Sequence, residues 1–154
     1  MSSECRTKIL DAVAARVEAR YGAETGTIGQ WFRKVVRGPW QPGNKMRPAC
    51  TVTDFGQRRG EKVNSDVTKS RILAFHLVLD LQENWDREEK NQDWSDRVQK
   101  IIAGIQNHKA AGGMKRLDYV QDDPFEVVLT NGASEQIWIV EFEAEYFEDY
   151  AEFG

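Results

Sequence analysis

The sequence is poor in cysteine and proline and has no long hydrophobic run. Its 154 residues include two cysteines, Cys5 and Cys50, and four prolines. Two cysteines cannot form a disulfide framework, and without a CxxC pair they give no redox or metal motif, so we expect reduced thiols in a cytoplasmic protein. No apolar stretch approaches the ~18 residues of a membrane span, and the N-terminus has no signal-peptide pattern. Length and composition predict one globular domain over residues 1–154.

Positive charge is absent from the end of the chain. All 21 lysines and arginines lie within residues 1–116, and the last 38 residues carry 11 carboxylates and no cation. The most basic stretch, 27–62, holds eight cations against Asp54 and Glu61. A protein with two oppositely charged ends can fold them onto each other or present them on different surfaces. In the second case copies can join head to tail through unlike surfaces.

Hydrophobic periodicity predicts an α+β fold. Ile9, Val13 and Val17 recur every fourth residue in the first helix, whereas Leu73 to Leu81 alternate as in a half-buried strand. Thr130-Asn131-Gly132-Ala133 is a strong hairpin signal. We therefore expect an antiparallel or mixed sheet, two helices packed on one face and a β-hairpin extension. The expected elements are helices at 3–21 and 93–108, an extended segment at 27–37, a strand at 48–55, a turn at 56–60, and strands at 61–67, 71–83, 116–121, 124–130 and 136–147.

The carboxylates of the last strand are the first candidates for catalysis. Glu141, Glu143 and Glu145 alternate with apolar residues and so share one face at intervals of about 6.6–7 Å. That spacing suits an inverting glycosidase, but three like charges in a row are more typical of a solvated sheet face. His76 and His108 lie in no nucleophile or metal motif, and the chain has no phosphate-binding glycine loop. We expect no enzyme activity, no cofactor and no metal site.

The basic middle of the chain is a candidate for nucleic-acid binding. Arg58 and Arg59, with Trp31, Phe32 and Trp40 near in sequence, could combine cations with stacking on bases. The overall charge of −4 and the lack of a known binding module favour a protein contact instead. Trp31 is expected in the core together with Trp138. Trp40 stands in a loop between two prolines, and we expect it to be exposed at a partner contact.

Three segments resemble the tail terminator, or tail completion, proteins of tailed bacteriophages, of the lambda minor tail protein U type. They are the strand from Arg71 (RILAFHLVLDL), the helix from Trp94 (WSDRVQKII) and the closing strand from Ile137 (IWIVEFEAEYF). The order of elements is similar over most of the chain, and 27–67 matches least well. The resemblance implies a non-enzymatic ring, typically of six copies, that caps the tail tube, stops its polymerisation and offers a joining surface to the head-side connector.

The partners that the resemblance implies are other copies of the chain, the tail tube protein and the connector. DNA passes through the ring without specific binding, no membrane is involved, and the protein resides in the virion after assembly in the bacterial cytoplasm. The alternatives are another neck, head-completion or tube protein, or a small nucleic-acid-binding accessory protein that uses residues 33–62. Exposed loops at 38–46 and 57–60 are expected to contact the tube or connector. The expected interface residues are Arg33, Arg37, Trp40, Lys45, Arg47, Arg58 and Arg59, and the expected lumen-lining acids are Glu141, Glu143 and Glu145.

Overall fold

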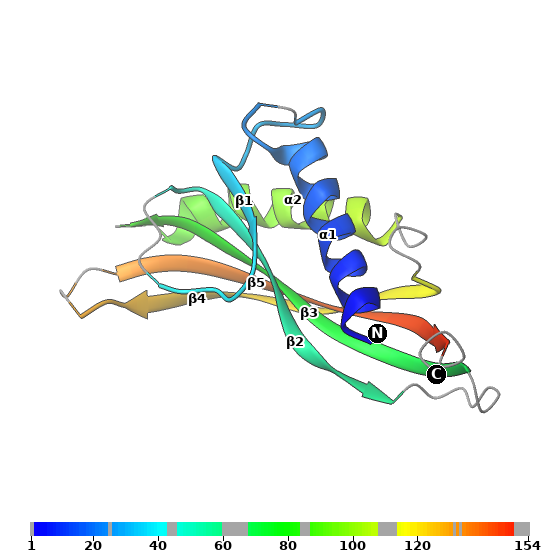
Figure 1. Cartoon of the computed structure of the whole chain (residues 1–154). Coiled ribbons are helices and arrows are strands. Elements are labelled where there is room, and N and C mark those ends of the chain that lie inside the picture. Colours follow the sequence, from blue (N-terminus) through cyan, green and yellow to red (C-terminus); the bar gives the residue numbers. More distant parts are fainter. Residues whose placement is uncertain are drawn as a thin grey trace.

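The computed structural model describes residues 2–24, 26–42, 46–59, 68–83, 87–107, 114–130, 132 and 134–149. Two helices lie over one face of a five-stranded sheet, so the α+β class expected from the sequence is confirmed (Figure 1). The sheet order is β1-β2-β3-β5-β4. The two longest strands, β3 and β5, are therefore neighbours near the middle of the sheet.

Helix α1 (Ser2–Tyr21) forms where the four-residue repeat predicts it. Ile9, Val13 and Val17 are buried against the sheet, because one apolar stripe of a helix faces the core. The hydroxyl of Tyr21 donates to the backbone carbonyl of Lys100 in the second helix, at 3.0 Å. The stripe and this bond hold α1 against both the sheet and its neighbour.

Helix α2 (Arg87–Gln106) begins six residues earlier than the predicted helix at 93–108. Its first residues, Arg-Glu-Glu-Lys, suggest a charged loop in the sequence but have high intrinsic helix propensity. The apolar spacing that predicted the helix is confirmed further along. Its buried members are Trp94, Val98, Ile101, Ile102 and Ile105.

The central strands β3 (Thr68–Glu83) and β5 (Ser134–Asp149) pair antiparallel over nearly their full length. Strand β4 (Arg116–Val128) pairs with β5 and is continuous, so the prediction of separate strands at 116–121 and 124–130 was wrong. Pro124 does not interrupt β4, because an edge strand tolerates a residue without an N–H. The predicted hairpin to β5 is confirmed, and Gly132 has the positive φ of 86° that such a turn requires.

The first two strands make the sheet mixed. Strand β1 (Lys34–Arg37) is short and runs parallel to β2 (Ala49–Arg59), so the extended segment predicted at 27–37 is a strand only at its end. The turn predicted at 56–60 was wrong for residues 56–59, because β2 continues through them to Arg59. The strand has an irregularity between Asp54 and Gln57, where Gly56 has a φ of 103°. The strand predicted at 61–67 lies outside the described residues. A parallel neighbour needs a crossover connection, and 38–48 provides it.

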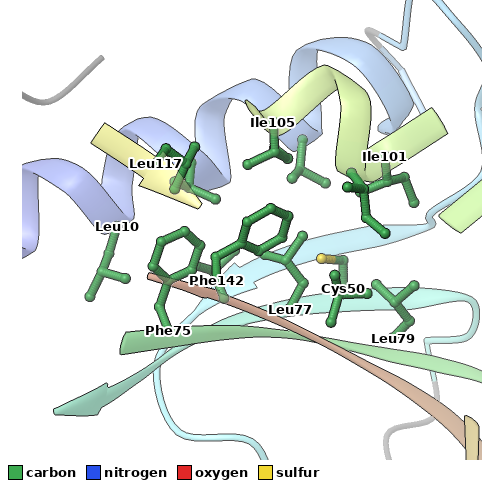
Figure 2. Close-up of a cluster of buried hydrophobic side chains, with 14 of the residues drawn as sticks. Leu10, Cys50, Phe75, Leu77, Leu79, Ile101, Ile105, Leu117 and Phe142 are labelled. Atoms are coloured by element: carbon green, nitrogen blue, oxygen red, sulfur yellow. The ribbon is translucent and has the colours of Figure 1, made fainter. Parts of the chain in front are cut away.

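The hydrophobic core lies between the helices and one face of the sheet (Figure 2). Phe75 of β3 and Phe142 of β5 stack with ring centroids 5.5 Å apart, and both are almost fully buried. Leu117 of β4 belongs to the same core. The other face of the sheet carries no helix among the described residues, and we call it the helix-free face.

Candidate assembly surfaces

The predicted acidic row lies on the helix-free face, because β5 alternates and its even-numbered residues from Trp138 to Tyr146 enter the core. Glu141 and Glu143 are half-buried, whereas Glu145 is only 3% exposed. Strand register places Asp118 of β4 opposite Glu143 and Gln121 opposite Glu141. Asp123 lies two residues beyond Gln121 and therefore on the same face. The solvent-accessible acids of this face are therefore Asp118, Asp123, Glu141 and Glu143, which we call the acidic patch.

Glu141 belongs to a small polar network. Its carboxylate lies 3.4 Å from Nε2 of His76 and accepts a hydrogen bond of 2.6 Å from the amide of Gln121. Phe55 stacks on the His76 ring at 3.6 Å and is itself 61% exposed. Burial lowers the pKa of His76 more than the negative charge of Glu141 raises it, so the imidazole is neutral at pH 7. Glu141 thus has partners typical of a structural surface acid.

The predicted basic residues whose side chains the structure describes have different surroundings. Arg37 donates to Asp11 of α1 at 2.9 Å, and Arg47 donates to Glu135 of β5 at 3.2 Å, so both cations pair within the chain. Arg33 is exposed. Arg58 and Arg59 stand at the end of β2, in register with Ile72 and Arg71 of β3. Lys45 lies outside the described residues.

The burial of the tryptophans differs in part from the prediction. Trp40 is half-buried, and its Nε1–H points at both carboxylate oxygens of Asp80, at 2.9 and 3.1 Å, so the prediction that its side chain is fully exposed was wrong. Its contact with a partner stays a prediction. The prolines on either side of Trp40 suggested an exposed loop. A buried carboxylate within reach of the indole instead accepts a hydrogen bond from its N–H, and this bond holds the side chain against the sheet. Trp138 is buried as predicted, and its Nε1–H donates to Asp122. Trp31 is half-buried and stacks on Tyr21 at 4.7 Å.

A buried pair of carboxylates, Asp80 and Glu135, was missed by the sequence reasoning. Both residues have no exposed surface. Burial, followed by a hydrogen bond with Glu135, raises the pKa of Asp80 to about 7, while Trp40 and Arg47 act in the opposite direction. A single acid within the apolar run of β3 was the signal in the sequence. Its partner lies 55 residues away in sequence, and no local spacing identifies it.

The two sides of the sheet are unlike. Strand β4 ends the sheet on one side and carries four carboxylates and one arginine. On the other side β1 pairs only with residues 49–52 of β2, so within the described part of the chain 53–59 has a strand on one side only. That free half of β2 includes Asp54, bound to Arg6 of α1, and ends in Arg58 and Arg59. Four of the exposed large hydrophobic residues stand on these two strands, namely Phe55, Val120, Phe125 and Val128.

The described ranges contain no candidate metal site and no candidate membrane span. There, no group of three or more His, Cys, Asp or Glu side chains is arranged to hold a metal ion. No helix in those ranges is long and apolar enough to span a membrane. Neither a protein-family model nor a curated protein matches the chain. Function therefore has to follow from the residues and their geometry.

Proposed function

We propose that this chain is a structural virion protein that closes into a ring on the end of a phage tail tube. The ring stops tube polymerisation and offers the joining surface for the head-side connector. The observation that carries this proposal is the unlike character of the two sheet edges. One edge is acidic (β4) and the other ends in two arginines (β2), and exposed hydrophobic side chains stand on both.

Unlike edges favour a ring over a two-fold dimer. A two-fold contact joins one patch to the same patch, which would oppose β4 carboxylates to β4 carboxylates, whereas a head-to-tail contact joins β4 to the β2 edge of the next copy. Head-to-tail contacts close into rings when the rotation between copies divides a full turn. Pro124 at the middle of β4 offers no N–H, so the contact is made by side chains rather than by one continuous sheet.

The helix-free face would then line the passage for DNA. The acidic patch gives this face a negative potential, which repels phosphates and lets DNA pass without binding. Glu145 is buried in the single chain, so of the three predicted lumen acids we retain Glu141 and Glu143. Trp40, Arg37 and Arg47 are each bonded to a carboxylate within the chain, which makes these three groups less available to a nucleic acid.

The test of the ring is the mass of the protein by light scattering after size exclusion, over a range of concentrations, with negative-stain images of the largest species. A closed oligomer with a central hole supports the proposal. If the protein stays monomeric, the ring must close on the tube, and terminal density on purified tail tubes is then required. A monomer that leaves tubes unchanged would contradict the proposal.

Ring formation should depend on salt. Opposite charges on the two edges would attract across the contact, and the Debye length falls from about 10 Å at 0.1 M to about 4–5 Å at 0.5 M salt. We expect the concentration for half-assembly to rise at least several-fold between these two conditions, measured by sedimentation or light scattering. Unchanged assembly at 0.5 M would show that the contact is not electrostatic.

Reversing the charge of the lumen should retain DNA. In Glu141→Lys/Glu143→Lys, lysines would attract the phosphates that the acids repel, so we expect rings that assemble normally but slow DNA ejection, measured by release of labelled DNA from particles. Glu24→Lys/Asp96→Lys is a matched control, since both residues are exposed and the net charge changes equally. Ejection at the wild-type rate from intact rings of the first variant would exclude the lumen assignment.

A further inference from the structure

Four cations outside the basic stretch 27–62 gather where helices α1 and α2 meet (Figure 1). Arg16 and Arg20 lie one turn apart on α1, and Arg97 and Lys100 lie one turn apart on α2. The three arginines are half-buried and Lys100 is exposed. We call these four residues the helix-layer cluster. The cluster and the acidic patch lie on opposite sides of the sheet.

Gly104 of α2 lets the two helices approach closely at this point. A Cβ atom there would stand 2.9 Å from Nε of Arg20 and 2.9 Å from the hydroxyl of Tyr21, so a side chain would displace one or both. Nε of Arg16 donates to the Gly104 carbonyl at 3.4 Å. Both arginines of α1 therefore rest against the last turn of α2. Lys100 is next to them, since its carbonyl accepts the hydrogen bond from Tyr21.

Aromatic rings hold two of the arginine head groups in place. The guanidinium carbon of Arg97 lies 5.4 Å from the centre of the Trp31 ring and 4.9 Å from that of Trp94. Trp31 stacks on Tyr21, and the guanidinium carbon of Arg20 lies 5.7 Å from the centre of the Tyr21 ring. A ring face attracts a cation without accepting its N–H groups in ordinary hydrogen bonds. Most donors of these two guanidinium groups therefore stay available to an anion.

The positive charge of the cluster is not balanced by carboxylates in the described part of the chain. No carboxylate there forms an ion pair with any of the four cations, whereas Arg6, Arg37 and Arg47 each have one. The C-terminal ends of both helices lie close to the cluster, and each is equivalent to about half a negative charge. Together they offset about one of the four positive charges. The cluster therefore attracts further anionic groups.

The spacing of the cations matches an extended acidic segment. Arg16 and Arg20 are about 6 Å apart along the axis of α1, since a helix rises about 1.5 Å per residue. Alternate residues of an extended segment are about 6.6–7 Å apart and point to the same side. Carboxylates at alternate positions can therefore reach both arginines at once, and each such pair forms charge-assisted hydrogen bonds.

A nucleic acid fits this surface less well than an acidic protein segment does. Tyr21 stacks on the Trp31 ring, and Arg97 lies over it. Trp94 is only 5% exposed, so neither indole is open to the stacking of a base. Asp96 is exposed beside Arg97 and interrupts the positive surface. A continuous run of phosphates would meet that negative charge, whereas a peptide carries its carboxylates at separate positions.

We propose that the helix-layer cluster is a docking surface for an extended acidic segment of a partner protein, with carboxylates at alternate positions. The carboxylates bind the guanidinium groups of Arg16, Arg20 and Arg97, and Lys100 adds attraction at the exposed rim. This function goes beyond the ring and does not depend on it, because all four cations belong to one copy. In a ring whose lumen is the helix-free face, the helix layer faces away from the passage and towards such a partner.

The test uses a fluorescent peptide of twelve residues in which glutamate alternates with serine, titrated with the full chain and followed by anisotropy. We expect saturable binding at 0.1 M salt, and no binding of a peptide with glutamine in place of glutamate. Arg97→Gln/Lys100→Gln should weaken binding at least about fivefold, because two of the four cations are lost. In protein labelled with fluorotryptophan, the peptide should shift the 19F signals of Trp31 and Trp94, and the double variant should show neither shift.

Lys100→Glu tests the same surface without touching the contacts of the rings. Its position is exposed, so the chain should fold, as circular dichroism can check. We expect this variant to weaken binding of the peptide at least about threefold. Wild-type affinity in folded Lys100→Glu would overturn the proposal.

Arg58→Gln/Arg59→Gln is the matched control, because it makes the same change in net charge at the β2 edge. It should bind the peptide as the wild type does, whether or not rings form. Equal weakening in this control and in Arg97→Gln/Lys100→Gln would overturn the proposal, and so would the absence of saturable binding by the wild type. A DNA strand of twelve nucleotides that binds more tightly than the peptide, and is lost in the same variant, would assign the cluster to nucleic acid instead.

Discussion

Phe142→Ala is expected to destabilise the fold by about 3–5 kcal/mol, as typical for a phenylalanine removed from a packed core. Phe142 is 1% exposed and stacks on Phe75 (Figure 2), and the Tyr119 ring meets it edge-on with ring centroids 6.2 Å apart. The ring lies between the central strands and the helices, so its loss leaves a cavity that both layers border. Urea unfolding followed by circular dichroism measures the change.

Phe125→Ala is the matched control for that variant. Phe125 stands on the neighbouring strand β4, is 47% exposed and faces away from the core. We expect its truncation to change the free energy of unfolding by no more than about 0.5 kcal/mol, the usual range for a surface substitution. Equal losses in the two variants would mean that the core does not lie between the helices and the sheet as described.

Reversing the charge of the β4 edge is expected to abolish ring formation. In Asp123→Lys/Glu126→Lys, an acidic edge becomes basic and meets the arginines of the next copy. Both residues are exposed, so the subunit should still fold. Like charges opposed across a contact cost several kcal/mol, and a ring repeats that cost at each contact. Light scattering should show a monomer at concentrations where the wild type assembles.

Glu24→Lys/Asp96→Lys serves again as the control, because it makes the same change in net charge away from the two edges. This variant should assemble as the wild type does. If it also dissociates, net charge rather than the β4 edge governs assembly, and the head-to-tail contact loses its support.

Long periodic segments of the fold could be predicted from the sequence. Helix α1 and strand β3 follow their apolar repeats, because burial of one face dictates the spacing of apolar residues. The short strand β1 could not be predicted, since its four residues are set by pairing with β2 rather than by their own pattern. The continuous β4 was missed because Pro124 suggested a break, and tolerance of proline depends on an edge position that only the topology reveals.

Some residues of the candidate site could likewise be predicted from the sequence, and others could not. The acidic face of β5 could be predicted, because alternation places Glu141 and Glu143 together. The contact of Trp40 and Arg47 with the buried pair Asp80 and Glu135 could not be predicted, because it joins segments that are distant in sequence. The same contact explains why Arg47 and Trp40, which the sequence suggested as partner contacts, are engaged inside the chain.

The ring through unlike edges is the central claim, and mixing two variants tests it most directly. Asp123→Lys/Glu126→Lys has two basic edges, and Arg58→Glu/Arg59→Glu has two acidic ones, so neither should assemble alone. Mixed in equal amounts, they should form rings of alternating copies with the mass of the wild-type ring, measured by light scattering and negative stain. Rings from either variant alone, or a mixture that stays monomeric where the wild type assembles, would contradict the claim.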